Sequence, residues 1–349
     1  MPDPKIQKVE FVGTKVAIVL EEHIRLHLDL DVAMADLRSG FVAWREHRAV
    51  NQPRIRIDWQ GCHATPGQKP LGYAWLHTLR AGLVESGIVG GKDYASLGFD
   101  VPAMWVTVVD ARTGKPIAFM ESDYLSRVRT AASAAIATEL LAPGDVTSLA
   151  HFGAGKISEP LVRAILKVRP TIKHVCVVRG SQEKGSPAWL SALGEGITGV
   201  LTDRERALEM AEIITTATSS SVPVVPDGSK YPHLRHLNLM GANHWKRREI
   251  GEELARRCLP ANGGYLVVDD AKQAETEAGD FRFLSENDDL DWSATPTLAL
   301  LLANENARKK AAQARPTAFK CVGIGLMDLA VAGGVLRRMG LLPPTSFAV

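Results

Sequence analysis

An apolar segment that ends in two closely spaced glycines constrains the fold of this chain more than any other feature. Residues 147–152 are largely apolar, Gly153-Ala154-Gly155 follows at once, and residues 158–168 have a helical pattern. A strand, a Gly-x-Gly turn and a helix are typical of a loop that holds a dinucleotide pyrophosphate. Glycine lets the backbone approach the phosphates, and the helix N-terminus supplies free N–H groups. The alternative is an ordinary strand–helix turn, because a lone Gly-x-Gly is a weak signal.

Strand and helix patterns alternate after this loop. Strands are expected at 174–178, 213–216, 237–240 and 265–268, with a helix at 203–212. Alternation of this kind predicts a Rossmann-type doubly wound α/β fold, in which helices cover both faces of a parallel sheet.

The first ~125 residues have a different pattern, with strand-like segments separated by turn residues. The expected strands are 14–20, 54–57, 92–95, 104–110 and 116–120. They predict a smaller α+β unit with an antiparallel sheet. The glycine-rich apolar segment after residue 317 is too short for a membrane span and is expected to be a helix.

Composition excludes several classes of function. A net charge of +2 over 349 residues gives no electrostatic case for nucleic acid or an anionic membrane. The widely spaced cysteines, with no local ligand spacing, argue against a metal site or a disulfide framework. The N-terminal residues lack the long apolar run of a signal peptide, so the cytoplasm is the expected compartment.

The end of the second expected parallel strand informs the choice of cofactor. NAD sites usually carry an acid there, which binds the ribose 2′-hydroxyl. Here Arg179 follows the strand at once, Ser181 and Lys184 lie in the next turn, and the nearest acid is Glu183. A guanidinium suits a 2′-phosphate, so the pattern predicts NADP(H), with NAD(H) as a second possibility. The alternative is a solvated basic loop.

Two further segments follow expected strands and should lie at the same edge of the sheet. Thr216, Ala217 and Thr218 come after one strand, and Asn243 comes shortly after another. The ligand crevice of a parallel sheet lies at the carboxyl ends of its strands, so the first three residues should face the cofactor. The alternative is a polar loop.

Two cations have unusual surroundings. Arg129 lies in a helix of small apolar residues, where it needs an anionic partner, either a substrate or a structural salt bridge. Lys92 follows Gly90-Gly91 and is a candidate proton donor, because a lysine in a closed site has a lowered pKa. On these residues alone, a surface lysine paired with Asp93 is the favoured interpretation.

Six motifs in this order resemble the ornithine cyclodeaminase/μ-crystallin family: RVRTAASAAIATELLA, FGAGK, TTATSS, NLMGANHWKRREI, VVDDAKQAETEAGD and FKCVGIGLMDLAVA. The resemblance runs from about Arg54 to the tail. It implies a substrate-binding and dimerisation domain (1–128 and 317–349), completed by the C-terminal helix, and a dinucleotide-binding Rossmann domain (129–316). It also implies homodimers or assemblies of dimers.

The resemblance assigns roles by position. Arg129 and Arg54 match the arginines that bind the substrate carboxylate, and Lys92 matches the catalytic lysine, which reverses the surface-lysine interpretation. Thr130 is expected to bind the cofactor, together with the loop Gly153-Ala154-Gly155.

One departure from the family pattern bears on the reaction. Cyclodeaminases have an aspartate base where this chain has Asn243, and an amide does not accept a proton at neutral pH. The expected activity is therefore NAD(P)H-dependent reduction of a small α-imino or α-keto acid to an α-amino acid, with Lys92 and Asn243 as catalytic residues. The alternatives are an ornithine or lysine cyclodeaminase, which releases ammonia, and a non-catalytic NADPH-binding protein of the crystallin kind.

Overall fold

The chain divides into two compact units. The computed structural model describes residues 6–11, 13–58, 74–97, 103–180 and 185–343. The first unit comprises Met1–Arg129 and Ile324–Val349, and the second comprises Thr130–Gly323. Two assignments differ from the expected boundaries. Arg129 falls in the first unit, and residues 317–323 fall in the second because they form a strand of its sheet.

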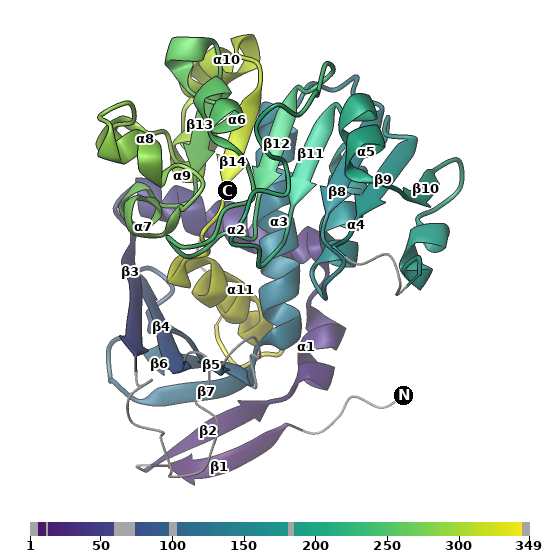
Figure 1. Cartoon of the computed structure of the whole chain (residues 1–349). Helices are drawn as coiled ribbons and strands as arrows, with labels where there is room; N and C mark the ends of the chain where they lie inside the picture. Colours follow the sequence, from purple (N-terminus) through teal and green to yellow (C-terminus); the bar gives the residue numbers. More distant parts are fainter. Residues whose placement is uncertain (1–5, 12, 59–73, 98–102, 181–184, 344–349) are drawn as a thin grey trace, which may run out of the picture. The chain divides into compact units, whose positions relative to one another are not determined.

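The first unit is built on a seven-stranded sheet of order β1-β2-β7-β6-β5-β4-β3 (Figure 1). Neighbouring strands are antiparallel except β2 and β7, which are parallel. The expected antiparallel arrangement does not hold for this pair, because β2 pairs on its second edge with a strand far along the chain. The strands are β1 (Gln7–Phe11), β2 (Thr14–Val19), β3 (Ala49–Asp58), β4 (Ala74–Leu83), β5 (Ile88–Leu97), β6 (Met104–Asp110) and β7 (Pro116–Glu121).

The described part of this unit also contains helices. They are α1 (Glu21–His27), α2 (Leu30–Arg45), the start of α3 (Asp123–Leu141) and α11 (Gly325–Arg338). Every residue of α11 from Gly325 to Leu336 is buried, and the helix packs on α2 and on β3–β6. Small residues permit this close approach: a Cβ on Gly40 of α2 would lie 2.9 Å from the Cβ of Ala330.

The second unit has a seven-stranded parallel sheet of order β10-β9-β8-β11-β12-β14-β13. Chain order reverses between β8 and β11, as in a doubly wound fold, so the predicted fold class is confirmed. The strands are β8 (Ser148–Phe152), β9 (His174–Val178), β10 (Thr198–Leu201), β11 (Ile213–Thr216), β12 (His236–Leu239), β13 (Tyr265–Val268) and β14 (Thr317–Lys320).

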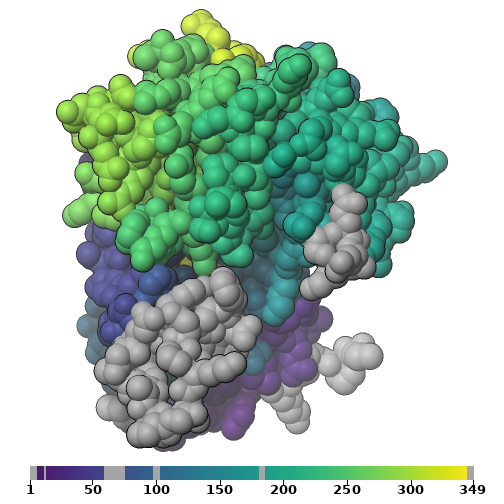
Figure 2. Space-filling model, viewed as in Figure 1, coloured from purple at the N-terminus to yellow at the C-terminus, as the bar shows by residue number. Residues whose placement is uncertain are grey.

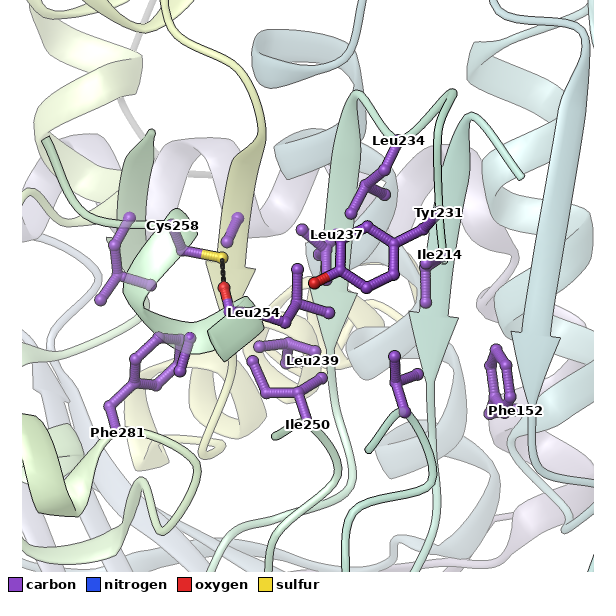
Figure 3. Packing of buried hydrophobic residues seen from close by; sticks show 14 of the residues in the cluster. Phe152, Ile214, Tyr231, Leu234, Leu237, Leu239, Ile250, Leu254, Cys258 and Phe281 are labelled. Carbon is purple, nitrogen blue, oxygen red and sulfur yellow. Dashed lines mark hydrogen bonds between the residues drawn. The ribbon is translucent and has the colours of Figure 1, made fainter. Parts of the chain in front are cut away.

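One face of the parallel sheet carries a large apolar core. Leu237 and Leu239 alternate along β12, so both side chains point to the face that also buries Ile214, Leu254 and Tyr231 (Figure 3). In the space-filling view, the green segments of this unit form a continuous surface (Figure 2). The helices are the rest of α3, then α4 (Ser158–Val168), α5 (Arg204–Met210), α6 (Glu252–Arg257), α7 (Ala271–Glu277), α8 (Arg282–Glu286), α9 (Leu298–Ala303) and α10 (Glu305–Gln313), with three short 3₁₀ segments: η3 (Ala188–Ala192), η4 (Pro260–Asn262) and η5 (Trp292–Ala294).

None of the helices in the described residues has the length and apolar character needed to cross a membrane.

Replacing Gly91 by alanine should destabilise the first unit strongly. A Cβ at this position would lie 1.8 Å from the carbonyl oxygen of Leu79 on the neighbouring strand. The strands must separate to admit it, so we expect a loss of about 3 kcal/mol or more in the free energy of unfolding, measured by denaturant titration. Gly144→Ala is the control, because a Cβ there meets nothing within 4 Å. Equal stability of the two variants would contradict this account.

Candidate functional site

Lys92, Arg129 and Asp328 form a buried charged cluster within the first unit. Lys92 Nζ lies 3.0 Å from Asp328 Oδ1, and Arg129 Nε lies 3.0 Å from the same oxygen. Lys92 also donates to Ser126 Oγ at 3.1 Å. The cluster therefore joins β5, α3 and α11, which are far apart in the sequence.

Burial sets the electrostatics of this cluster. The exposed fractions are 3% for Lys92, 6% for Arg129 and 0% for Asp328. Burial lowers the pKa of Lys92 from 10.5 to about 8. The charge of Arg129 and, less strongly, that of Arg54 act in the same direction, whereas Asp328 opposes them.

The surface-lysine interpretation of Lys92 is wrong. Asp93, the neighbour it invoked, accepts from Arg80 Nη2 at 2.8 Å and 2.9 Å and from the Thr78 hydroxyl at 2.8 Å. Successive residues of a strand point to opposite faces, so Asp93 points outward and Lys92 points inward.

An aromatic wall lies on the same face of β5. Tyr94, two residues after Lys92, places its ring centroid 5.6 Å from Lys92 Nζ. The Tyr94 ring stacks on His77 of β4, with centroids 4.3 Å apart and an angle of 10° between the ring planes. His77 Nε2 lies 3.2 Å from Ser96 Oγ. These rings fix one side of the space around the ammonium group.

Arg54 approaches the cluster from β3. The strand pairing is irregular between Gln52 and Ile55, which brackets this residue, and Arg54 is half-buried. Its effect on the pKa of Lys92 places its charge within electrostatic reach of the ammonium group. The three predicted substrate-binding residues of the first unit are thus electrostatically coupled.

In the second unit, the predicted cofactor loop (Gly153, Ala154, Gly155) lies at the carboxyl end of β8. The Gly153 N–H donates to Val178 O at the end of β9, at 2.9 Å. Gly153 has a φ of +133°, and a Cβ there would lie 2.7 Å from Ala217 O, after β11. Around Gly155 a Cβ would meet nothing within 4 Å, and α4 begins without a side-chain cap. The loop therefore lies where chain order reverses, which is the usual place for a dinucleotide.

The next predicted cofactor residues follow β9. Arg179 donates through Nη1 to Gly185 O at 2.8 Å. Ser181, Glu183 and Lys184 lie outside the described residues.

Glu249 was missed by the sequence analysis. It is fully buried. Its Oε1 accepts from the N–H and hydroxyl of Thr218, at 2.7 Å and 2.9 Å, and its Oε2 accepts from the N–H groups of Gly241 and Ala242, at 2.8 Å and 3.1 Å. Burial raises the pKa of its carboxyl group. Glu249 follows a basic run that indicates surface, so no sequence signal distinguished it.

A buried ion pair supports Glu249. Lys320 Nζ lies 2.9 Å from Asp280 Oδ2, and both side chains are fully buried. Asp280 Oδ1 accepts from the N–H groups of Glu249 and Ile250. The loops after β11 and β12 are therefore held by interior charge.

This network changes the interpretation of the segment after β11. The Ala217 N–H donates to Phe152 O at 2.9 Å, which places Ala217 beside the glycine loop, and Thr216 is buried in the sheet. The hydroxyl of Thr218, which was expected to face the cofactor, donates to Glu249.

Asn243 and Thr130 both lie in the second unit. Asn243 is half-buried, and its Oδ1 accepts from Arg247 Nη1 at 3.2 Å. Thr130 is buried in α3, and its carbonyl oxygen accepts from the Ser133 hydroxyl at 2.8 Å.

The architecture defines a two-unit α/β protein with a Rossmann-type sheet. Residues 91–339 match the model of the ornithine cyclodeaminase/mu-crystallin family, and the chain belongs to that family.

Three similar proteins carry two different activities in their names. The chain is 28% identical over 241 residues to the Delta(1)-pyrroline-2-carboxylate reductase of Bacillus cereus, covering 67% of this chain and 70% of the relative. It is 26% identical to a probable ornithine cyclodeaminase from Bordetella pertussis, with a TM-score of 0.78 and coverage of 93% and 96%. The Delta(1)-pyrroline-2-carboxylate reductase of Thermococcus litoralis, solved with NADH and L-proline, has the same fold at 21% identity (TM-score 0.77, coverage 92% and 96%).

His151 of β8 should make stability depend on pH. Burial lowers its pKa from 6.5 to about 3, so the folded protein keeps it neutral while the unfolded chain takes a proton below about pH 6.5. Its contribution is therefore present above pH 6.5 and is lost as the pH falls toward 3. His151→Leu should flatten the dependence of unfolding free energy on pH by about 1 kcal/mol per unit between pH 6 and 4. The control His233→Leu, which removes an exposed histidine, should leave the slope unchanged; an unaltered slope in both variants would contradict the assignment.

Proposed function

We propose that this chain is an NAD(P)H-dependent reductase of a small α-imino or α-keto acid, with an α-amino acid as product. The observation that carries the proposal is the buried cluster of Lys92, Arg129 and Asp328 in the first unit. The names of the Bacillus and Thermococcus relatives, both reductases of a cyclic imino acid, agree with it.

Net positive charge in the cluster suits a substrate carboxylate. Arg129 and Arg54 both act electrostatically on Lys92, and the carboxylate of Asp328 opposes them. Arg129 binds Asp328 through Nε, which leaves the Nη pair of its fork for another acceptor. Arg129 and Arg54 would together bind the carboxylate, since guanidinium groups hold carboxylates through paired hydrogen bonds.

Lys92 is suited to donate a proton. With a pKa of about 8, Lys92 is mostly protonated at neutral pH. Its ammonium group is nevertheless much more acidic than that of a lysine in water, whose pKa is 10.5. Asp328 and Ser126 fix the position of Nζ, so the proton can be directed to the substrate nitrogen or oxygen.

The second unit fits a dinucleotide. The strained, close-packed Gly153, the open space at Gly155 and the uncapped N-terminus of α4 together suit a pyrophosphate. Thr130, Ala154, Thr216, Ala217 and the backbone of Thr218 would line the same site. When bound, a reduced nicotinamide would supply the hydride. Arg179, directly after β9, supports a preference for NADP(H) over NAD(H).

Asn243 separates the reductase from a cyclodeaminase. Its amide would orient the substrate nitrogen but cannot serve as a base. Reduction needs only a hydride and a proton, whereas cyclodeamination also needs oxidation of an amine and loss of ammonia. The residues present therefore favour reduction.

A homodimer is proposed from the outer face of the first unit's sheet. Exposed apolar side chains lie on four of its strands: Ile55 and Ile57 on β3, Val89 on β5, Trp105 on β6 and Phe119 on β7. Strand pairing places them on the face opposite Lys92. A second copy of the chain would cover such a face.

The reaction is tested by absorbance at 340 nm. With Δ1-pyrroline-2-carboxylate we expect one NADPH oxidised for each proline formed and no ammonia. Ammonia and proline from ornithine, without net change in the cofactor, would identify a cyclodeaminase instead. Tight NADPH binding without turnover of any imino or keto acid would identify a crystallin-like binding protein.

Arg129→Gln should raise KM by about 10- to 100-fold, since it removes a charge-assisted contact worth roughly 1.5–3 kcal/mol. Arg127→Gln is the matched control. Arg127 lies on the same helix but pairs with Asp123 at 3.0 Å, away from the cluster. An unchanged KM for Arg129→Gln would refute its role.

A further inference from the structure

Asp328 is an acid in an otherwise apolar stretch of α11. The helix is buried along its length from Gly325 to Leu336, and Asp328 is fully buried within it. An ionised carboxylate in such a place costs several kcal/mol unless cations compensate it. The sequence analysis assigned it no role.

The two cations of the cluster share one oxygen of Asp328. Oδ1 lies 3.0 Å from both Lys92 Nζ and Arg129 Nε. Oδ2 makes no hydrogen bond to the residues that the structure describes. The carboxylate thus acts on both cations through a single atom.

The surroundings of Lys92 make Asp328 its main source of negative charge. The polar and charged groups around Lys92 are Arg54 on β3, His77 on β4, Tyr94 on β5, Ser126 and Arg129 on α3, and Asp328 on α11. Among the strongest influences on Lys92 in the described part of the chain, Asp328 alone favours the ammonium form.

We propose that Asp328 is a positioning residue that keeps Lys92 protonated and aims its ammonium group for proton transfer. This inference rests on the proposed function, in which Lys92 is the proton donor. The Nζ–H bond breaks as the substrate nitrogen gains the proton, and Lys92 becomes a neutral amine.

The shared oxygen explains why the arrangement tolerates this loss of charge. Once Lys92 is neutral, Asp328 remains ionised and still pairs with Arg129 at 3.0 Å. Arg129 and Asp328 still compensate each other, so the proton can leave without the large penalty of an uncompensated carboxylate. A carboxylate paired with Lys92 alone would resist the transfer.

Asp328→Asn tests the charge with little change in shape. The amide oxygen can still accept from Lys92 and Arg129, and the amide nitrogen replaces Oδ2, which has no donor among the described residues to clash with. The charge that favours the ammonium form is lost, so the pH above which kcat/KM for imine reduction falls should move down by about one unit or more.

Lys92→Arg and Asp36→Asn are measured beside it. Lys92→Arg keeps a cation that does not titrate in the measured range. If kcat/KM still falls at high pH in this variant, the titrating group is on the substrate and is not Lys92. Asp36 of α2 pairs with Arg338 of α11 at 2.9 Å, so Asp36→Asn removes a half-buried carboxylate without touching Lys92, and its pH profile should match that of the native enzyme.

The outcomes separate the two proposals. If the fall persists unchanged in Lys92→Arg, Lys92 is not the proton donor and the proposed mechanism fails. If the fall is absent from Lys92→Arg, but the pH at which it occurs is unchanged in folded Asp328→Asn, only the role of Asp328 is overturned.

If Asp328→Asn does not fold, a measurement on the native protein tests the same proposal. The pH dependence of the Lys92 side-chain ¹³Cε chemical shift in NMR, assigned with Lys92→Arg, reports the protonation of Lys92 without turnover. We expect it to titrate near 8. Titration below about 7 would overturn the role of Asp328, because its carboxylate would then fail to offset burial and the two arginines.

Discussion

The carboxylate of Asp328 is the interaction on which the candidate site depends. It lies within an apolar helix, where water cannot solvate it, and holds Lys92 and Arg129 at equal distances through one oxygen. Each cation would be costly in that interior without it. The same burial that makes the cluster expensive also brings Lys92 into a range where it can exchange a proton near neutral pH. Stability and chemistry are thus set by one arrangement of charges.

The second unit also uses buried carboxylates, but to shape the backbone. The carboxylate of Glu249 accepts hydrogen bonds from backbone N–H groups of the loops after β11 and β12. Asp269, after β13, accepts from the N–H groups of Val322 and Gly323, after β14. Four strand ends are therefore fixed by two side chains. Loops at this edge of a parallel sheet are usually free to vary, and tying them to interior groups gives a ligand a preformed surface.

The sequence predicted what local patterns determine. The strand, turn and helix around Gly153 were predicted correctly because they are adjacent in the chain, and the parallel sheet followed from the alternation of strands and helices. β6 was placed at its observed limits. The parallel pairing of β2 with β7 was not predicted, because nothing local specifies a partner so distant in the chain.

Burial of individual charges was harder to predict. From the local sequence, Lys92 is predicted to be a surface residue paired with Asp93. It is buried because α11 packs on the sheet. Asp328 and Glu249 were missed for the same reason, since an isolated acid has no periodic pattern. The family resemblance identified Lys92 and Arg129 but not the carboxylate that joins them.

The position of α11 has a consequence for biosynthesis. Its residues leave the ribosome after both the first unit's sheet and the whole of the parallel sheet. Until then the face of the earlier sheet on which α11 packs is incompletely covered, and Lys92 and Arg129 lack their shared counter-ion. A nascent or prematurely terminated chain therefore contains the parallel sheet of the second unit while the first unit still lacks the helix that completes its core and its charged cluster.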